Sequence, residues 1–383
     1  MLPTKNCEEP TVRKDNRLSM DANTRILYIS HVQWNWIKQR PQYLAELLAQ
    51  TYPLTFFQAQ VFRGRGLKPN DRKGLQVRVL PRIPTLFEKP SFLVAHNDWI
   101  ARRIIRKEIA KSSVNLIWLT SPRTFRWMPR SYDGKVIYDC MDDYDAFYNG
   151  AKKSEFQQLE QAIVKRANLI LASSTKLVGK IQKLDHTKTK PVILVRNGFN
   201  GRVFDLSDQQ KKVYKIGDMF KGCYFGTIGS WFDFSVLQDS LIRFPNLSYK
   251  IIGPIGDGVS VLHHPRIEYT GPVAHNSLPQ FVDDCDFFIM PFRINDVVLS
   301  VDPVKMYEYI NYGKDIVCVR YPEVQRFADY TEFYNGSEEY CHAISAVIRR
   351  SKRKYSDTQR FEILSKSSWS SRTEQILEAL GEL

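Results

Sequence analysis

The chain contains 383 residues, of which 43% are hydrophobic and 25% are charged. These ordinary values argue against a disordered, collagen-like or coiled-coil protein, and the length allows two domains of usual size. Lys and Arg number 55 against 41 Asp and Glu, so the net charge of +14 predicts an anionic partner: a nucleotide, a phospholipid surface or a nucleic acid. The six cysteines are widely spaced without a CxxC pair, which argues against a zinc or disulfide framework and favours a reducing compartment.

The N-terminal segment 1–23 is polar and lacks the apolar core of a signal peptide, so we expect a flexible leader. No apolar stretch approaches the roughly 18 residues that a membrane-spanning helix requires. We therefore expect a cytoplasmic protein whose contact with a membrane, at the inner face of the plasma membrane, is peripheral.

Short apolar runs alternate with helical patterns up to about residue 200. Helices are predicted at 41–49 and at 151–166, where Phe156, Leu159 and Ile163 share one face. Nearly continuous apolar strands that alternate with helices indicate a parallel sheet covered on both faces. The predicted strands are 25–30, 54–60, 75–80, 115–120, 135–140, 168–173 and 191–195.

A polar segment at 200–220 is predicted to be a linker, and a second α/β series follows it. The chain ends in an amphipathic helical pattern that contains Ile376, Leu377 and Leu380. Ligands of open α/β sheets bind at the carboxyl ends of the strands, so the site is expected there in both halves. The predicted strands are 223–229, 247–253, 266–271, 285–291 and 315–319, and the helices are 232–243, 277–283, 301–312 and 337–350.

The helix predicted around Lys305 carries the richest local pattern. Asp302 suits the N-cap, Pro303 the first helical position and Gly313 the C-terminal stop. A helix start with a nearby Lys305 is a natural pyrophosphate site, and Glu308 would accept hydrogen bonds from a ribose or sugar hydroxyl. The alternative is a capped helix with one surface ion pair.

A second motif is the turn at Gly229 and Ser230, between a predicted strand and a helix that begins near Asp233. Glycine lets the backbone approach a phosphate closely, although such turns are common. The motif is not GxGxxG, and the first strand of the chain has no glycine turn. Both facts argue against a dinucleotide oxidoreductase.

Four carboxylates, Asp139, Asp142, Asp143 and Asp145, follow the strand predicted at 135–140. Crowded carboxylates raise one another's pKa, so one of them suits a general base for an acceptor hydroxyl. A metal site is the competing interpretation, because hard cations prefer oxygen ligands. A solvated loop with helix caps is the third.

The first predicted strand leads into His31, Trp34 and Trp36, and Arg40 opens the next helix. Tryptophans in a loop suit stacking on sugar faces, a membrane interface or plain packing. A lone histidine such as His31 is more often structural than catalytic.

Positive charge is concentrated at 101–135, which holds nine basic and two acidic residues. Arg102, Arg103 and Arg106 accompany Ile105 and Ile109 in a basic amphipathic helix. Such a surface suits anionic lipid headgroups or a lipid-pyrophosphate acceptor, and a solvated helix face is the alternative.

Taken together, these segments resemble the GT-B glycosyltransferases of bacterial surface polysaccharide synthesis, of the teichuronic-acid and xanthan glucuronosyltransferase type. The resemblance runs from Arg25 to the C-terminus and depends on the order and spacing of its local marks. These are QRPQYLAELLA (39–49), VIYDCMDDYDAF (136–147), ANLILASS (167–174), VRNGFN (195–200), GTIGSWFD (226–233), DPVKMYEYINYGK (302–314) and SSWSSRTEQIL (367–377).

The resemblance implies two Rossmann-like domains that face each other across a cleft. An acceptor domain at 24–200 and a donor domain at 201–366 would be followed by a helix at 367–383 that packs back on the first domain. The implied donor-binding residues are Gly229, Ser230, Phe292, Arg293, Ser300, Asp302, Lys305 and Glu308. The implied catalytic candidates are Asp142, Asp143 and His31, and the implied acceptor contacts are Trp34, Trp36 and Arg40.

The resemblance also implies a nucleotide-sugar donor, most simply UDP-linked, and a glycan or lipid-linked saccharide acceptor. No cofactor, essential metal or nucleic acid is expected. Many retaining relatives carry a second glutamate eight residues before the position of Glu308, where this chain has Ser300, so inversion with Asp142 as the base is expected. Three alternatives stay open: a nucleotide-sugar epimerase on the same fold, a nucleic-acid-binding protein, and a lipid-surface scaffold without catalysis.

Overall fold

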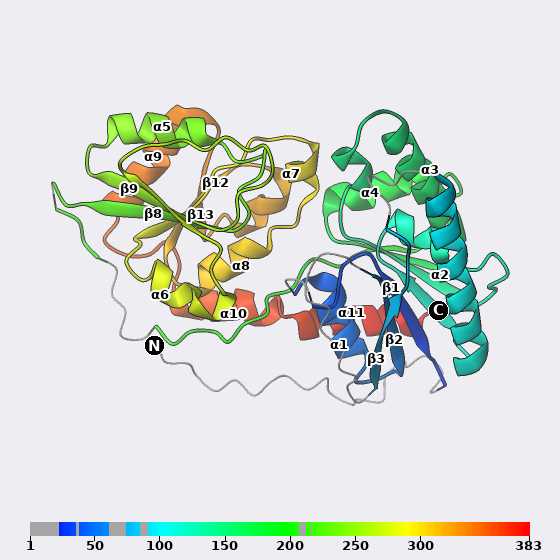
Figure 1. Cartoon of the computed structure of the whole chain (residues 1–383). Helices are drawn as coiled ribbons and strands as arrows, with labels where there is room; N and C mark the ends of the chain where they lie inside the picture. Colours follow the sequence, from blue (N-terminus) through cyan, green and yellow to red (C-terminus); the bar gives the residue numbers. More distant parts are fainter. Residues whose placement is uncertain (1–22, 36–37, 61–73, 85–90, 207–211, 216) are drawn as a thin grey trace. The chain divides into compact units, whose positions relative to one another are not determined.

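The computed structural model describes residues 23–35, 38–60, 74–84, 91–206, 212–215 and 217–383 (Figure 1). The chain divides into two compact units. The N-terminal unit comprises the described residues up to Gly198 together with Trp369–Leu383, and the C-terminal unit comprises Phe199–Ser368. The predicted leader lies, except for Asn23, outside the described residues.

The N-terminal unit contains a seven-stranded sheet in the order β3-β2-β1-β4-β5-β6-β7, with every neighbouring pair parallel. All five residues of β1 are buried, because Leu27 and Ile29 face one core cluster while Ile26 and Tyr28 face another. A strand covered on both faces needs such a continuous apolar run. The strands are β1 Ile26–Ser30, β2 Leu54–Ala59, β3 Leu75–Leu80, β4 Leu116–Leu119, β5 Lys135–Cys140, β6 Leu169–Ala172 and β7 Val192–Leu194.

Helices cover both faces of this sheet. The cluster on one face includes residues of α2, α3 and α4, and the cluster on the other includes residues of α1 and α11. Helix α11 follows the C-terminal unit in sequence, yet Trp369, Ile376 and Leu380 are buried in the N-terminal unit. The helices are α1 Arg40–Leu48, α2 Ser91–Ser112, α3 Gly150–Arg166, α4 Thr175–Leu184 and α11 Trp369–Gly381, with 3₁₀ turns η1 Pro122–Trp127 and η2 Tyr144–Phe147.

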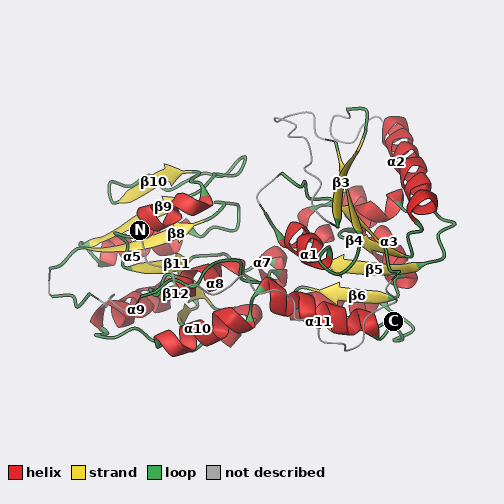
Figure 2. Ribbon diagram, turned by 90° about the horizontal axis from the view of Figure 1, so that it is seen from below, coloured by secondary structure: helices red, strands yellow, loops and turns green. Residues whose placement is uncertain are grey.

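The C-terminal unit contains a six-stranded parallel sheet in the order β10-β9-β8-β11-β12-β13 (Figure 2). Helices α5 and α9 contact each other on one side of it, and α8 contacts α10 on the other (Figure 1). The strands are β8 Phe220–Phe225, β9 Leu247–Ile252, β10 Ile267–Gly271, β11 Phe287–Met290, β12 Asp315–Val319 and β13 Thr331–Tyr334. The helices are α5 Phe234–Arg243, α6 Leu278–Val282, α7 Asp296–Ser300, α8 Val304–Asn311, α9 Gly336–Arg349 and α10 Asp357–Lys366, with 3₁₀ turns η3 His275–Ser277 and η4 Pro322–Phe327.

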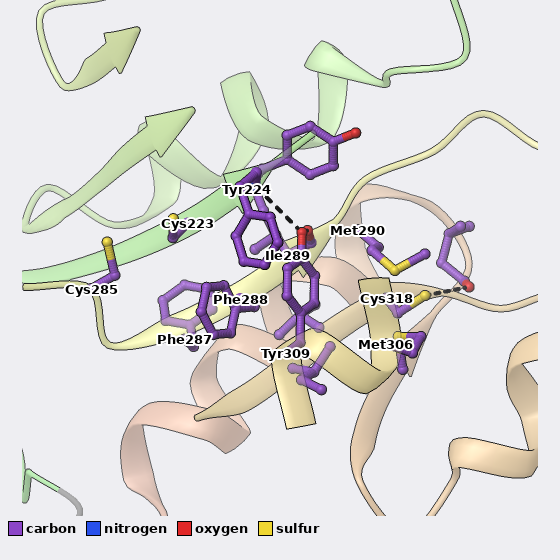
Figure 3. Packing of buried hydrophobic residues seen from close by; sticks show 14 of the residues in the cluster. Cys223, Tyr224, Cys285, Phe287, Phe288, Ile289, Met290, Met306, Tyr309 and Cys318 are labelled. Carbon is purple, nitrogen blue, oxygen red and sulfur yellow. Dashed lines mark hydrogen bonds between the residues drawn. The ribbon is translucent and has the colours of Figure 1, made fainter. Parts of the chain in front are cut away.

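An aromatic core fixes α8 against this sheet (Figure 3). The rings of Phe288 on β11 and Tyr309 on α8 are stacked, with centroids 4.4 Å apart. The Tyr309 hydroxyl accepts a hydrogen bond from the backbone of Phe225 at 3.5 Å. Met306 and Ile310 are also fully buried, so the inner face of α8 is set by packing. The opposite stripe of α8 carries Lys305 and Glu308.

The predicted strands and most predicted helices are present, and one difference concerns the site. Helix α8 begins at Val304 with Pro303 at the N-cap, so the predicted cap by Asp302 is wrong. Gly313 follows the helix with a φ of +65°, as the predicted stop requires. None of the helices in the described ranges is long and apolar enough to cross a membrane.

Candidate functional site

The ammonium group of Lys305 lies at the carboxyl end of β8, directly over Gly226. A Cβ atom on Gly226 would lie 2.0 Å from Lys305 Cε and 2.7 Å from Nζ, and the φ of Gly226 is +142°. Only glycine combines that conformation with so little space. A fold that keeps a glycine under a lysine therefore holds the amine at the sheet edge where ligands of α/β proteins bind.

A second glycine supports the same arrangement. Gly253 follows β9 with a φ of +142°, and a Cβ there would lie 2.0 Å from the carbonyl oxygen of Gly226. The Gly226 amide donates to the carbonyl of Ile252 at 2.8 Å. The sequence pattern had pointed to Gly229 and missed the structural roles of Gly226 and Gly253. Their shared signal is a glycine immediately after an apolar strand.

The Lys305 ammonium group has no hydrogen bond or ion pair to any other described residue. Its Nζ lies over the face of the Tyr224 ring, 6.0 Å from the ring centroid. Burial lowers the pKa of Lys305, and the nearby Glu308 carboxylate opposes that change. A partly buried cation that makes no hydrogen bond or ion pair with the described residues suits the binding of an anion, because an anionic ligand would compensate for the lost hydration.

Glu308 lies one turn further along α8 and is one-quarter exposed. Burial raises the pKa of Glu308, while His275 and Lys305 lower it. His275 Nδ1 lies 3.7 Å from Glu308 Oε1. Sequence reasoning did not single out His275, because a lone histidine after a strand carries no recognisable pattern.

The Gly229–Ser230 turn lies beside the end of β11. Gly229 is buried, and a Cβ there would lie 2.4 Å from the ring of Trp231, whereas Ser230 is exposed. The Arg293 amide donates to the carbonyl of Trp231 at 2.7 Å, which ties the turn to the segment after β11.

Phe292 and Arg293 belong to that segment. The backbone of Phe292 pairs with that of Phe232, and its ring lies 6.0 Å from the ring of Tyr224. Arg293 remains 60% exposed, with Nε 3.5 Å from Asp233 Oδ1. Because Tyr224 also lies near Lys305, it connects the lysine to this turn.

Ser300 and Asp302 do not face this site. Ser300 is 2% exposed and donates to the carbonyl of Val297 at 2.7 Å. The Asp302 carboxylate is buried and forms an ion pair with Arg326. Their predicted contacts with a donor are therefore corrected: both side chains stabilise the segment that leads into α8.

In the N-terminal unit, Asp142 follows β5 and is partly exposed. Burial raises the pKa of Asp142 to about 7, with Arg40 opposing and Asp139 and Asp143 adding repulsion. Its carboxylate has no hydrogen bond or ion pair within the described ranges. These are the properties of a general base that titrates near neutral pH.

Unlike Asp142, Asp143 forms an ion pair. Its carboxylate lies 2.5 Å from Lys180 Nζ, which also pairs with Asp145 and, at 2.7 Å, with Glu160. Burial raises the pKa of Asp143, and Lys180 opposes that change. The four-residue network holds α3 and α4 to the loop after β5. Within the described residues, no group of three or more His, Cys, Asp or Glu side chains is arranged to hold a metal.

His31 follows β1 and contacts the end of β4. Its Nδ1 lies 2.8 Å from Thr120 Oγ1, and its Nε2 lies 3.4 Å from the Tyr144 hydroxyl. Surrounding protein atoms lower the pKa of His31, so the imidazole is neutral at pH 7 even though it keeps an exposed surface.

Arg40 is not available to an acceptor. It is 2% exposed, and its guanidinium binds the buried carboxylate of Asp139 at 2.8–3.1 Å and the carbonyl of Val195 at 2.7 Å. The predicted acceptor contact of Arg40 is therefore corrected to a structural role. Trp34 packs edge-on against Phe56 at 4.9 Å and is only partly exposed, and Trp36 lies outside the described residues.

Comparisons with known proteins identify the fold of the chain and a distant relative. No family model matches the chain. One curated relative, "Putative teichuronic acid biosynthesis glycosyltransferase TuaH" of Bacillus subtilis strain 168, is 26% identical over 239 residues, 57% of this chain. The match spans 60% of that relative's length.

Three solved structures are similar over more than nine-tenths of the chain. Sucrose-phosphate synthase of Thermosynechococcus elongatus has a TM-score of 0.69 at 12% identity, covering 92% of this chain and 97% of that one. HepE of Anabaena, in complex with UDP and glucose, has a TM-score of 0.61 at 15% identity, covering 94% and 100%. A trehalose-6-phosphate synthase described in terms of glycosyl transfer with retention has a TM-score of 0.61 at 9% identity, covering 94% and 99%. The chain therefore has the GT-B fold and a distant sequence relationship to a teichuronic acid biosynthesis glycosyltransferase.

Proposed function

We propose that this protein is a glycosyltransferase that moves a sugar from a UDP-sugar to a hydroxyl group of a glycan or lipid-linked saccharide in surface polysaccharide synthesis. The observation that carries the proposal is the Lys305 ammonium group, held over Gly226 with no hydrogen bond or ion pair to the residues that the structure describes. The similarity to TuaH and the UDP and glucose bound to HepE support it. A lipid-linked acceptor would place the protein in the cytoplasm, at the inner face of an anionic plasma membrane.

In the proposed reaction the acceptor oxygen bonds to the anomeric carbon as the bond to the diphosphate breaks. Negative charge grows on the leaving phosphate, and the Lys305 ammonium group stabilises it. Glu308 accepts hydrogen bonds from donor hydroxyls. A fixed cation in a partly desolvated site stabilises such charge more than water does, because it needs no reorganisation.

The first test is a thermal-shift panel of UDP-, GDP- and ADP-sugars. At 100 times Kd a ligand stabilises the folded state by about 2.7 kcal/mol, which raises Tm by roughly 5 °C or more in a unit of this size. We expect that rise with a UDP-sugar, and UDP release when an acceptor is added. A product isomer formed from the UDP-sugar alone would identify an epimerase, and no shift with any nucleotide-sugar would contradict the proposal.

Replacing Gly226 with alanine is expected to abolish the UDP-sugar shift, because the new Cβ would occupy the place of Lys305 Cε. Gly258→Ala is a matched control: Gly258 has a φ of +73° with nothing within 4 Å of the added Cβ. Both variants place an alanine at a positive φ, which costs about 1–3 kcal/mol of backbone strain. Calorimetric titration with UDP should separate them, and equal affinities in the two variants would show that the Lys305 position does not matter for binding.

Inversion receives no support from these comparisons, because one similar synthase is described as retaining. Asp142→Asn tests the stereochemical prediction. An inverting enzyme with Asp142 as its base should lose about 10²–10⁴-fold in rate, and native activity should fall below pH 7 as this carboxylate is protonated. Product analysis by NMR gives the anomeric configuration. A loss of less than tenfold with a retained anomer would exclude Asp142 as the base.

A further inference from the structure

Helix α2 of the N-terminal unit presents one long exposed face to solvent. Of its 22 residues only Asp98, Ala101 and Ile105 are buried, and they lie on the side that packs against the sheet. Figure 2 shows α2 as a long helix along one side of its unit. The outward face, termed here the α2 face, consists of Phe92, Ala95, His96, Trp99, Arg103, Arg106, Lys107, Ala110 and Lys111.

Two large apolar side chains project from the α2 face. Phe92 is 69% exposed and Trp99 is 51% exposed, which places them among the most exposed large hydrophobic residues described. The Arg103 guanidinium lies 5.5 Å from the Trp99 ring, and His96 stacks on the same ring at 5.8 Å. An aromatic ring flanked by a guanidinium group and an imidazole ring is amphipathic, with an apolar body and a polar border.

The charge on the α2 face is of one sign. Arg103, Arg106, Lys107 and Lys111 are exposed on it, and no carboxylate is. Both acidic residues of the helix are turned away: Asp98 accepts from the Trp127 indole at 2.9 Å, and Glu108 accepts from Ser112 at 2.8 Å.

We propose that the α2 face binds the surface of an anionic lipid bilayer, with the helix lying in the plane of the interface. Basic side chains would meet the headgroups while Phe92 and Trp99 enter the boundary with the acyl chains. A second copy of this face is a poor partner, because apposed copies would bring like charges together.

The biological purpose of this surface rests on the proposed function: binding to the bilayer would bring the N-terminal unit to a lipid-linked acceptor. Binding to the bilayer itself requires neither the donor nor Lys305. Failure of one proposal therefore leaves the other measurable.

The experiment is co-sedimentation of the full chain with vesicles of phosphatidylcholine alone or with 30% phosphatidylglycerol. Arg106→Glu/Lys107→Glu removes charge from the α2 face, and Arg349→Glu/Lys352→Glu makes the same change on exposed residues of the C-terminal unit. Each basic residue near an anionic surface strengthens binding about fivefold, so the first pair should weaken it at least about 25-fold. The control pair should change it less than about threefold, and 0.5 M salt should weaken native binding.

Brominated lipid provides an independent readout of depth. Tryptophan quenching by these lipids should fall in Trp99→Phe, because the proposal places Trp99 in the interface. All variants should keep the native circular dichroism spectrum and unfolding temperature, which excludes misfolding without reference to the donor. The proposal would be overturned if both charge-reversal pairs lost the same amount of vesicle binding, or if the native protein bound neutral vesicles equally well. It would also be overturned if duplex DNA competed for binding and phosphatidylglycerol had no effect. Concentration-dependent dimers that vanish in Trp99→Phe would instead identify a second copy as the occupant.

Discussion

Replacing Lys305 with methionine is expected to remove the UDP-sugar thermal shift and to lower kcat/KM by about 10²–10³-fold, the range seen when one preorganised donor to a developing oxyanion is lost. Methionine keeps an unbranched stem over Gly226, so the change removes mainly the charge. Because the ammonium group makes no hydrogen bond or ion pair with the described residues, contact with an anionic ligand is the main interaction that the substitution removes.

The stability of the unliganded Lys305→Met variant provides a second test of this prediction. Burial lowers the pKa of Lys305 in the folded state, so the charged form is disfavoured on folding, and this penalty is present at neutral pH, below the pKa of the unfolded chain. Lys305→Met should therefore unfold at the same temperature as the native protein or higher. Lys352→Ala, an exposed lysine of the same unit, is the control and should leave donor binding unchanged. Native affinity for UDP-sugar in Lys305→Met would contradict the assignment.

Replacing Arg40 with methionine is expected to destabilise the N-terminal unit by about 3–5 kcal/mol, the cost of leaving a buried charge without its partner. The side chains of Arg40 and Asp139 are 1% and 0% exposed, and the guanidinium also holds the carbonyl of Val195. Six of the seven tryptophans belong to the N-terminal unit, so tryptophan fluorescence in urea follows its unfolding.

A double substitution separates the contribution of the ion pair to stability from that of side-chain packing. Arg40→Met/Asp139→Leu removes both charges and should recover much of the lost stability, since an apolar pair of similar volume can replace a buried ion pair at little cost. Arg103→Met, on the exposed α2 face, should change the unfolding free energy by less than about 0.5 kcal/mol. A loss of that small size in Arg40→Met would mean that water reaches the Asp139 carboxylate.

The helix that carries Lys305 and Glu308 could be predicted from local patterns. Lys305, Glu308 and Gly313 were placed correctly on one helix and its stop, because helix periodicity and glycine conformation act over a few residues. The ligand contacts of Arg40 and Asp302, which the resemblance implied, could not be checked against the local sequence. Their partners Asp139 and Arg326 lie 99 and 24 residues away, beyond what a helix-start signature can indicate.

The sequence by itself determined the alternation of buried strands and helices, since a strand covered on both faces must be apolar throughout. It also determined which residue types stand at the strand ends. Only the tertiary structure decided that Gly226 lies under Lys305, that Arg40 and Asp302 are buried in ion pairs, and that the side chains of Phe92 and Trp99 on α2 stay in solvent. Burial and ion pairing depend on which distant segments meet, and that is settled by packing rather than by neighbours in the chain.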